Sequence, residues 1–177
     1  MTSPLSQRGV VLIGMAGAGK TTVGQLLAER WSTPFIDTDE QLERHSGESL
    51  QSQLDRLGYA AMRQAEEAFV ATCDLPPGAV VATGGSVVYG PRAMARLRRY
   101  GVCVYLQISL DTVMKRVDNW QNRGFSCAPG QTLAQVYEER LPLYQQYADL
   151  TLSCDDLRPQ QVVQQLVTCL LPFGASE

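Results

Sequence analysis

The sequence predicts an α/β fold: a three-layer α/β/α sandwich with a five-stranded parallel sheet. Short apolar runs rich in β-branched residues alternate with longer stretches of helical periodicity along the chain. The apolar runs are nearly continuous, which is typical of strands covered on both faces of a parallel sheet. The length of 177 residues suits one domain of this kind, and we expect a single domain over residues 1–177.

The first half of the chain is predicted to hold three strands, at residues 9–13, 33–37 and 79–83. A helix follows the first strand, because Val23, Leu27 and Trp31 recur at helical spacing. After the second strand, helical patterns cover residues 39–46, 49–57 and 59–73, and a Pro-Pro-Gly turn at 76–78 ends them. The third strand runs directly into Gly84 and Gly85.

In the second half, strands are predicted at residues 102–108 and 148–153, with helices at 91–100, 110–120, 132–147 and 158–170. Pro142 lies inside one of these helices and predicts a kink or a break there. The stretch 119–131 has no clear period and contains Gly124, Pro129 and Gly130. Irregular stretches of this length inside a domain are usually functional or disordered, so we expect a mobile lid around 119–131.

Composition narrows the functional classes. The net charge of −3 disfavours nucleic acid as a partner. No apolar run approaches the ~20 residues of a membrane span, and the first eight residues lack the apolar core of a signal peptide. We expect a cytoplasmic monomer without membrane contact. Five scattered cysteines and a single histidine, His45, favour reduced thiols over a zinc site, and no basic partner for a catalytic thiol is evident at Cys127.

Residues 14–21 fit the pattern of Gly, four free positions, Gly, Lys and then Ser or Thr, between a predicted strand and a predicted helix. In such a loop, backbone N–H groups and the N-terminus of the helix face phosphate oxygens. Lys20 is expected to reach the β- and γ-phosphates, and the Thr21 hydroxyl is expected to bind Mg²⁺. The motif therefore predicts ATP and Mg²⁺ as cofactors.

Other polar residues follow the next two strands, where the ligands of parallel sheets bind. Asp37 and Asp39 lie two apart: one carboxylate suits Mg²⁺, and the other suits a hydroxyl that attacks a phosphoryl group. A helix N-cap at Thr38 or Asp39 is the structural alternative. Gly84 and Gly85 can offer backbone N–H groups to a ligand.

Three arginines are candidates for binding phosphate or carboxylate: Arg63, Arg123 and Arg140. Each is ambiguous alone. Arg63 precedes Glu66 by three residues in a helical stretch, which also fits a surface ion pair of little energetic value.

Taken in order, these residues resemble the shikimate kinase family of phosphate-loop kinases. The resemblance covers about residues 8–170 and includes the loop 14–21, the Asp-Thr-Asp at 37–39, Arg63 with Glu66, Gly84 with Gly85, a lid, and the segments 140–144 and 148–149. The family implies a P-loop kinase fold and phosphorylation of shikimate to shikimate 3-phosphate from Mg·ATP. That reaction belongs to aromatic amino-acid biosynthesis.

The resemblance also implies residue roles. ATP is bound by Gly17, Ala18, Gly19, Lys20, Thr21 and Thr22, with Arg116 stacked on the adenine. Thr21 and Asp37 serve Mg²⁺, the latter through water, and Asp39 contacts the substrate hydroxyl as the candidate base. Arg63 and Arg140 grip the substrate carboxylate, with backbone contacts from Gly84 and Gly85. The catalytic set is Lys20, Asp39 and the lid residue Arg123, which lies seven residues after Arg116 as in the family.

The chain departs from the family pattern near the acceptor. Met62 stands where the family usually has Phe, and Ser86 stands where it usually has a third glycine after the third strand. Gly124 and Phe125 follow Arg123 where the family usually has Pro-Leu-Leu. Another small hydroxy acid such as homoserine therefore stays open as the substrate. A GTP-binding switch is disfavoured because Asn-Lys-x-Asp is absent. The short lid and the carboxylate-type arginines disfavour a nucleoside-monophosphate kinase, and the retention of Lys20, Asp37 and Asp39 disfavours a non-catalytic ATP-binding module.

Overall fold

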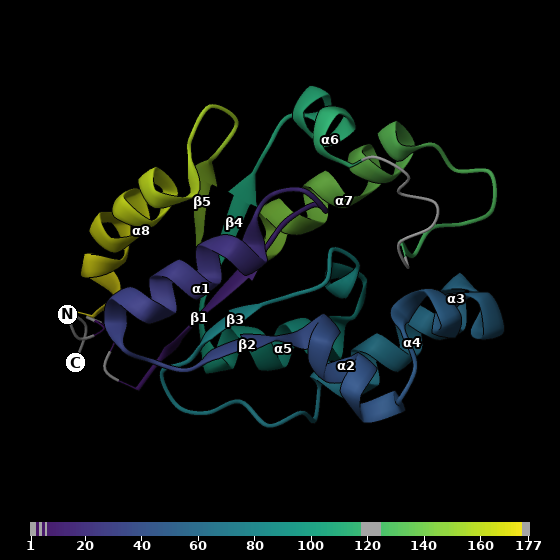
Figure 1. Ribbon diagram of the computed structural model, residues 1–177, viewed down its shortest axis with the longest axis horizontal. Coiled ribbons are helices and arrows are strands. Elements are labelled where there is room, and N and C mark those ends of the chain that lie inside the picture. Colours follow the sequence, from purple (N-terminus) through teal and green to yellow (C-terminus); the bar gives the residue numbers. More distant parts are fainter. Residues whose placement is uncertain (1–2, 4, 6, 118–124, 175–177) are drawn as a thin grey trace.

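Five parallel strands form the central sheet of the computed structural model, which describes residues 3, 5, 7–117 and 125–174 (Figure 1). The strands are β1 (Gly9–Ile13), β2 (Phe35–Asp37), β3 (Val80–Ala82), β4 (Gly101–Gln107) and β5 (Leu150–Ser153). Their order across the sheet is β2-β3-β1-β4-β5, and each neighbouring pair is parallel. The predicted sheet is confirmed, with each strand beginning and ending within two residues of its predicted limits.

Helices cover both faces of this sheet. They are α1 (Lys20–Trp31), α2 (Thr38–Ser46), α3 (Leu50–Leu57), α4 (Tyr59–Val70), α5 (Pro91–Tyr100), α6 (Leu110–Arg116), α7 (Leu133–Tyr147) and α8 (Pro159–Gly174). A short 3₁₀ helix, η1 (Val87–Tyr89), precedes α5. Figure 1 shows α1 and α8 side by side on one face of the sheet and α5 with α7 on the other, which confirms the three layers. Helices α2, α3 and α4 form a group beside the carboxyl end of β2.

The sheet is the core of the molecule. Residues Val10, Val11, Leu12 and Ile13 of β1 are at most 1% exposed, and β3 and β4 are equally buried apart from Gln107. Burial on both faces explains why these strands read as continuous apolar runs. Within the part of the chain that the structure describes, none of the helices has the length and apolar composition needed to cross a membrane.

Several boundaries differ from the predictions. Helix α7 continues through Pro142 without a break, because the buried side chains of Arg140 and Tyr144 anchor the helix on either side of the missing N–H donor. Helix α4 ends at Val70 rather than 73, and α8 extends four residues past 170, through Pro172. Helix α6 ends at Arg116, with Val117 as its C-cap, rather than at 120. Residues 119–124 of the predicted lid lie outside the described residues, and the described part of the lid, 125–131, is irregular.

Candidate active site

The loop between β1 and α1 has a backbone that only glycine adopts easily. Gly14, Gly17 and Gly19 have φ angles of 146°, 79° and 85°. A Cβ atom at Gly14 would lie only 2.7 Å from the carbonyl oxygen of Leu106, so the loop packs closely on the end of β4. Gly19 forms the N-cap of α1 without a side-chain capping bond, so the first N–H groups of the helix face the loop.

Lys20 lies at the centre of this loop. Its side chain is only 8% exposed, and its Nζ donates hydrogen bonds to the carbonyl oxygens of Gly14 (2.7 Å) and Met15 (2.8 Å). Burial lowers the pKa of Lys20 to about 8, although the carboxylates of Asp39 and Asp37 oppose the shift. The ammonium group is therefore held where it can face an anion at neutral pH.

Thr21 and Asp37 come together beside the loop. The Thr21 hydroxyl donates to Asp37 Oδ2 at 2.7 Å, across sixteen residues of sequence. Asp37 Oδ1 also accepts from the N–H groups of Asp39 (3.0 Å) and Glu40 (3.4 Å) and so caps α2. The N-cap alternative at Thr38 or Asp39 is thus wrong, because Asp37 occupies that position. Adjacent hydroxyl and carboxylate oxygens are ligands of the kind that Mg²⁺ takes in nucleotide sites, so the pair fits this ion.

Since Asp37 caps the helix, Asp39 is left to face the cleft. Withdrawal from water, reinforced by the nearby carboxylates of Glu66 and Asp37, raises the pKa of Asp39 to about 7, although Lys20 opposes the shift. Gly84 lies between the side chains of Asp39 and Glu66. A Cβ atom added to Gly84 would lie 2.5 Å from Asp39 Oδ1 and 2.6 Å from Glu66 Oε1. The two carboxylates therefore flank one point of the backbone.

Two pockets meet at Asp39. The first, of about 360 Å³, is lined by loop residues Gly17, Gly19, Lys20, Thr21 and Thr22 together with Asp37. The second, of about 100 Å³, is lined by Gly84, Glu66, Ser86 and Arg140 among others. Asp39, Ala16 and Gly85 line both pockets. The structure thus brings the phosphate loop and the acceptor-side residues to a common boundary.

Arg140 and Arg63 meet on the ring of Tyr89. Arg140 is 1% exposed; its Nη2 donates to the carbonyl oxygen of Ser126 at 2.6 Å and its Nε to the Tyr89 hydroxyl at 3.4 Å. The Arg63 guanidinium carbon lies 3.6 Å from the centroid of the Tyr89 ring, and that of Arg140 lies 5.4 Å from it. Arg140 lines the acceptor-side pocket, whereas Arg63 is not one of its lining residues and is joined to Arg140 through Tyr89. Two neighbouring guanidinium groups suit a carboxylate or a phosphate.

The predicted pair of Arg63 and Glu66 does not form within 4.0 Å in the described part of the chain. Glu66 is buried and instead accepts a hydrogen bond from the Ser86 hydroxyl. Burial raises the pKa of Glu66, although the Ser86 hydrogen bond and the arginines oppose the shift. The surface ion pair considered as an alternative is therefore wrong, because Glu66 points into the acceptor pocket.

Three of the remaining predicted residues, Arg116, Gly85 and Ala18, lie within the described structure, and Arg123 does not. Arg116 lies against the phosphate loop, with Nη1 donating to the Gly17 carbonyl and Nη2 to the Asp155 carbonyl, each at 3.2 Å. Gly85 lies beside Arg140, and its carbonyl oxygen accepts from the Tyr144 hydroxyl at 2.7 Å. Ala18 is buried in the loop. Arg123 lies outside the described residues.

Sequence reasoning missed Tyr89 and Ser126, which contact both arginines. No sequence motif around Tyr89 or Ser126 indicates a functional role, because each residue joins the site through contacts with segments that are distant in the sequence. Glu66 and Ser86 were visible in the sequence separately, as a helical neighbour of Arg63 and as a departure from a glycine run.

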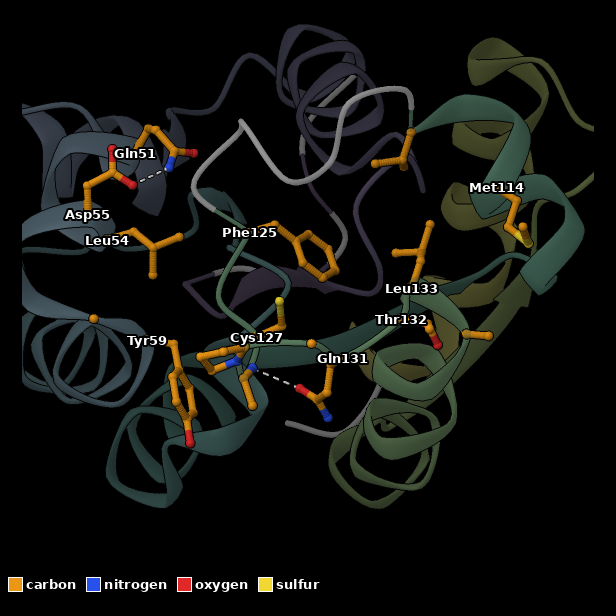
Figure 2. Close-up of a pocket in the computed structure, with 16 residues that line it drawn as sticks. Gln51, Leu54, Asp55, Tyr59, Met114, Phe125, Cys127, Gln131, Thr132 and Leu133 are labelled. Atoms are coloured by element: carbon orange, nitrogen blue, oxygen red, sulfur yellow. Dashed lines mark hydrogen bonds between the residues drawn. The ribbon is translucent and has the colours of Figure 1, made fainter.

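A larger pocket of about 740 Å³ adjoins the acceptor side, and Phe125 lines both. Figure 2 shows Phe125 between the α3 residues Gln51, Leu54 and Asp55 and the opposite wall at Met114 and Leu133. Cys127 lies in this pocket and is partly buried. Burial raises the pKa of its thiol, so Cys127 is not activated as a nucleophile.

Comparisons with known proteins agree on one family. A family model described as shikimate kinase matches residues 16–171. A shikimate kinase of Pseudomonas entomophila (strain L48) is 35% identical over 162 residues, which cover 90% of this chain and 94% of the relative. A shikimate kinase of Sulfurihydrogenibium sp. (strain YO3AOP1) is 30% identical, with 91% and 96% covered.

Solved structures extend the likeness to three dimensions. A shikimate kinase from Acinetobacter baumannii in complex with shikimate superimposes with a TM-score of 0.86 at 26% identity, covering 95% of each chain. The shikimate kinase from Aquifex aeolicus has a TM-score of 0.78 at 26% identity, covering 94% of this chain and 99% of that one.

Proposed function

Because the chain belongs to the shikimate kinase family, a family of phosphotransferases with an alcohol acceptor, we propose that it transfers the γ-phosphoryl group of Mg·ATP to a hydroxyl group of shikimate. The product is shikimate 3-phosphate, within aromatic amino-acid biosynthesis. The observation that carries the proposal is the position of Asp39, which lines both the phosphate-loop pocket and the acceptor-side pocket. A group at that boundary can contact the acceptor hydroxyl at the point of transfer.

On the nucleotide side, residues 17–22 would bind the phosphates of ATP, and Arg116 would lie against the adenine. Thr21 and Asp37 would hold Mg²⁺, which supplies neutralising charge on the phosphate oxygens when bound. Lys20 is well placed for the same role, because its ammonium group lies at the loop and a pKa of about 8 keeps most of its charge at neutral pH.

On the acceptor side, Arg63 and Arg140 would bind the substrate carboxylate, and Gly84 and Gly85 would contribute backbone contacts. Asp39 would take the proton of the attacking hydroxyl, a role for which a pKa near the working pH is favourable. Arg123, outside the described residues, would stabilise the charge of the transferred phosphoryl group. We also propose that the enzyme acts as a monomer in the cytoplasm, with residues 119–131 as its lid.

A screen of ADP release, coupled to a spectroscopic signal, tests this function directly. Purified enzyme with Mg·ATP is offered shikimate, homoserine, gluconate or a nucleoside monophosphate. We expect turnover with shikimate at least about tenfold above every other acceptor. Absence of ADP release with shikimate, or faster release with another acceptor, would reject the proposal.

A further inference from the structure

We propose that Tyr89 is a positioning residue of the acceptor side, whose ring and hydroxyl hold Arg63 and Arg140 so that both guanidinium groups face one carboxylate. The inference rests on the proposed function, because that function assigns the two arginines to the carboxylate of shikimate. In this role Tyr89 acts through the arginines and is not a catalytic residue.

The first observation is the position of the Tyr89 ring between two helices. Tyr89 is the last residue of η1, whereas Arg63 comes from α4 and Arg140 from α7. The guanidinium carbons of the two arginines lie 3.6 Å and 5.4 Å from the ring centroid. The electron-rich face of an aromatic ring attracts a guanidinium group within about 6 Å of its centroid. The ring therefore favours the approach of two cations that repel each other.

The second observation is the orientation of the Tyr89 hydroxyl. Its oxygen accepts a hydrogen bond from Arg140 Nε at 3.4 Å. The hydroxyl also donates to the carboxylate of Glu139, and this hydrogen bond holds the pKa of Glu139 below its usual value, although slight burial opposes the shift. A carboxylate can only accept, so the hydroxyl proton is directed to Glu139 and a lone pair is left for Arg140. The hydroxyl thus helps to fix the orientation of the Arg140 guanidinium.

The third observation is that the two arginines already share one acceptor. Nη2 of Arg140 donates to the carbonyl oxygen of Ser126 at 2.6 Å, and Nη2 of Arg63 donates to the same oxygen at 3.4 Å. Guanidinium groups from two helices therefore direct N–H donors toward a single oxygen atom. A substrate carboxylate offers oxygens that can accept from both groups in the same way.

The fourth observation is how few other contacts hold Arg63. Among the residues that the structure describes, no acidic group lies within 4.0 Å of its guanidinium, and its buried Nε has no hydrogen-bond partner. The ring of Tyr59 is more distant than that of Tyr89, with its centroid 5.3 Å from the guanidinium carbon. Without the Tyr89 ring, the substrate would have to order a long side chain on binding, and this cost weakens affinity.

Steady-state kinetics of Tyr89→Leu with shikimate and Mg·ATP test this inference. We expect the KM for shikimate to rise about tenfold, the scale of a cation–π contact shielded from water. The kcat and the KM for ATP should stay within about twofold, because the lost interaction concerns binding of the acceptor. Tyr89→Phe keeps the ring and loses only the hydroxyl, so it should hold the KM within about threefold of the wild type.

The matched control is Tyr147→Leu. Tyr147 is also a partly buried tyrosine, at the end of α7, where it packs against the hydrophobic core. Its replacement makes the same chemical change outside the site, so both KM values and kcat should stay within about twofold.

A double-mutant cycle separates positioning from a merely structural role. In an Arg63→Ala background the ring has lost its nearer guanidinium group. Tyr89→Leu should then raise the KM for shikimate by no more than about threefold, the part due to the hydroxyl. A KM that is unchanged in Tyr89→Leu, or that rises equally in both backgrounds, would overturn the inference.

Two further provisions keep the test decisive. If Tyr89→Leu does not fold, Tyr89→Met fills the same space with a flexible apolar side chain that has no aromatic face. Calorimetry with shikimate alone should show the same tenfold loss of affinity, independently of turnover. A wild-type enzyme that fails to phosphorylate shikimate would reject the proposed function itself. An active wild-type enzyme that Tyr89→Leu matches in KM and affinity would reject only the role of Tyr89.

Discussion

Substitution of Gly84 by alanine should disable phosphoryl transfer without disturbing nucleotide binding. The new Cβ atom would lie 2.5 Å from Asp39 Oδ1 and 2.6 Å from Glu66 Oε1, whereas ordinary van der Waals contact begins at 3.4 Å. The two carboxylates must therefore retreat by about 1 Å. A misplacement of about 1 Å in a reacting group costs about 10²-fold in rate, which corresponds to about 2.7 kcal/mol of activation free energy.

The fold should tolerate this change. Both clashing oxygen atoms end side chains that can rotate, so we expect a loss of only about 1 kcal/mol in the free energy of unfolding, the low end for overpacking. Calorimetry should find the affinity for Mg·ATP unchanged, because a Cβ atom at Gly84 has neither Lys20 nor Thr21 among its nearest neighbours.

The assay is ADP release with shikimate, and Gly47→Ala is the control. A Cβ atom at Gly47 would meet nothing within 4 Å, but the φ of 73° strains any other residue. That variant should lose about 1–2 kcal/mol of stability and keep its kcat. A Gly84→Ala enzyme whose kcat lies within about twofold of the wild type would refute the assignment of Asp39 to the reaction.

Three other predictions address separate parts of the site. Asp39→Asn should lower kcat by about 10²–10⁴-fold, the usual contribution of a general base, while Mg·ATP still binds in calorimetry; full activity would contradict the role of base. Arg63→Ala should raise the KM for shikimate at least about tenfold and leave the KM for ATP unchanged, and equal effects on both constants would remove Arg63 from the acceptor pocket. The kcat/KM for shikimate should rise with pH to about 7, as Asp39 loses its proton and becomes able to accept one, and should fall above about 8, as Lys20 loses its charge. In Asp39→Asn the rising limb should disappear from any residual activity; a rising limb that persists would assign it to another group.

Much of the fold could be predicted because the sequence patterns that indicate its strands and helices involve residues close together in the chain. The strands of a covered parallel sheet are apolar along their whole length, and the helices between them repeat their apolar residues at helical spacing. The phosphate loop could be predicted for the same reason, because its glycines at 14, 17 and 19, which adopt positive φ angles, lie within six residues of one another. Pro142 was the exception. Its conformational preference predicted a kink or a break in the helix, but α7 is continuous there because the neighbouring residues Arg140 and Tyr144 are buried.

The acceptor pocket was only partly predictable. Gly84, Gly85 and Asp39 could be chosen because they follow strands whose carboxyl ends meet at one edge of a parallel sheet. Spacing along α4 suggested that Glu66 pairs with Arg63, but its partner is Ser86, twenty residues further along the chain. The contact of Tyr89 with both arginines also depends on α4, η1 and α7 packing together.

The element order, the phosphate loop and the residues that follow each strand could be derived from the amino-acid sequence, because they depend on the conformational preferences of neighbouring residues. The strand order across the sheet, the partner of Glu66 and the raised pKa of Asp39 became known from the folded structure. Each of these depends on which distant segments exclude water from one another. Burial sets both the cost of an unpaired charge and the partner available to it.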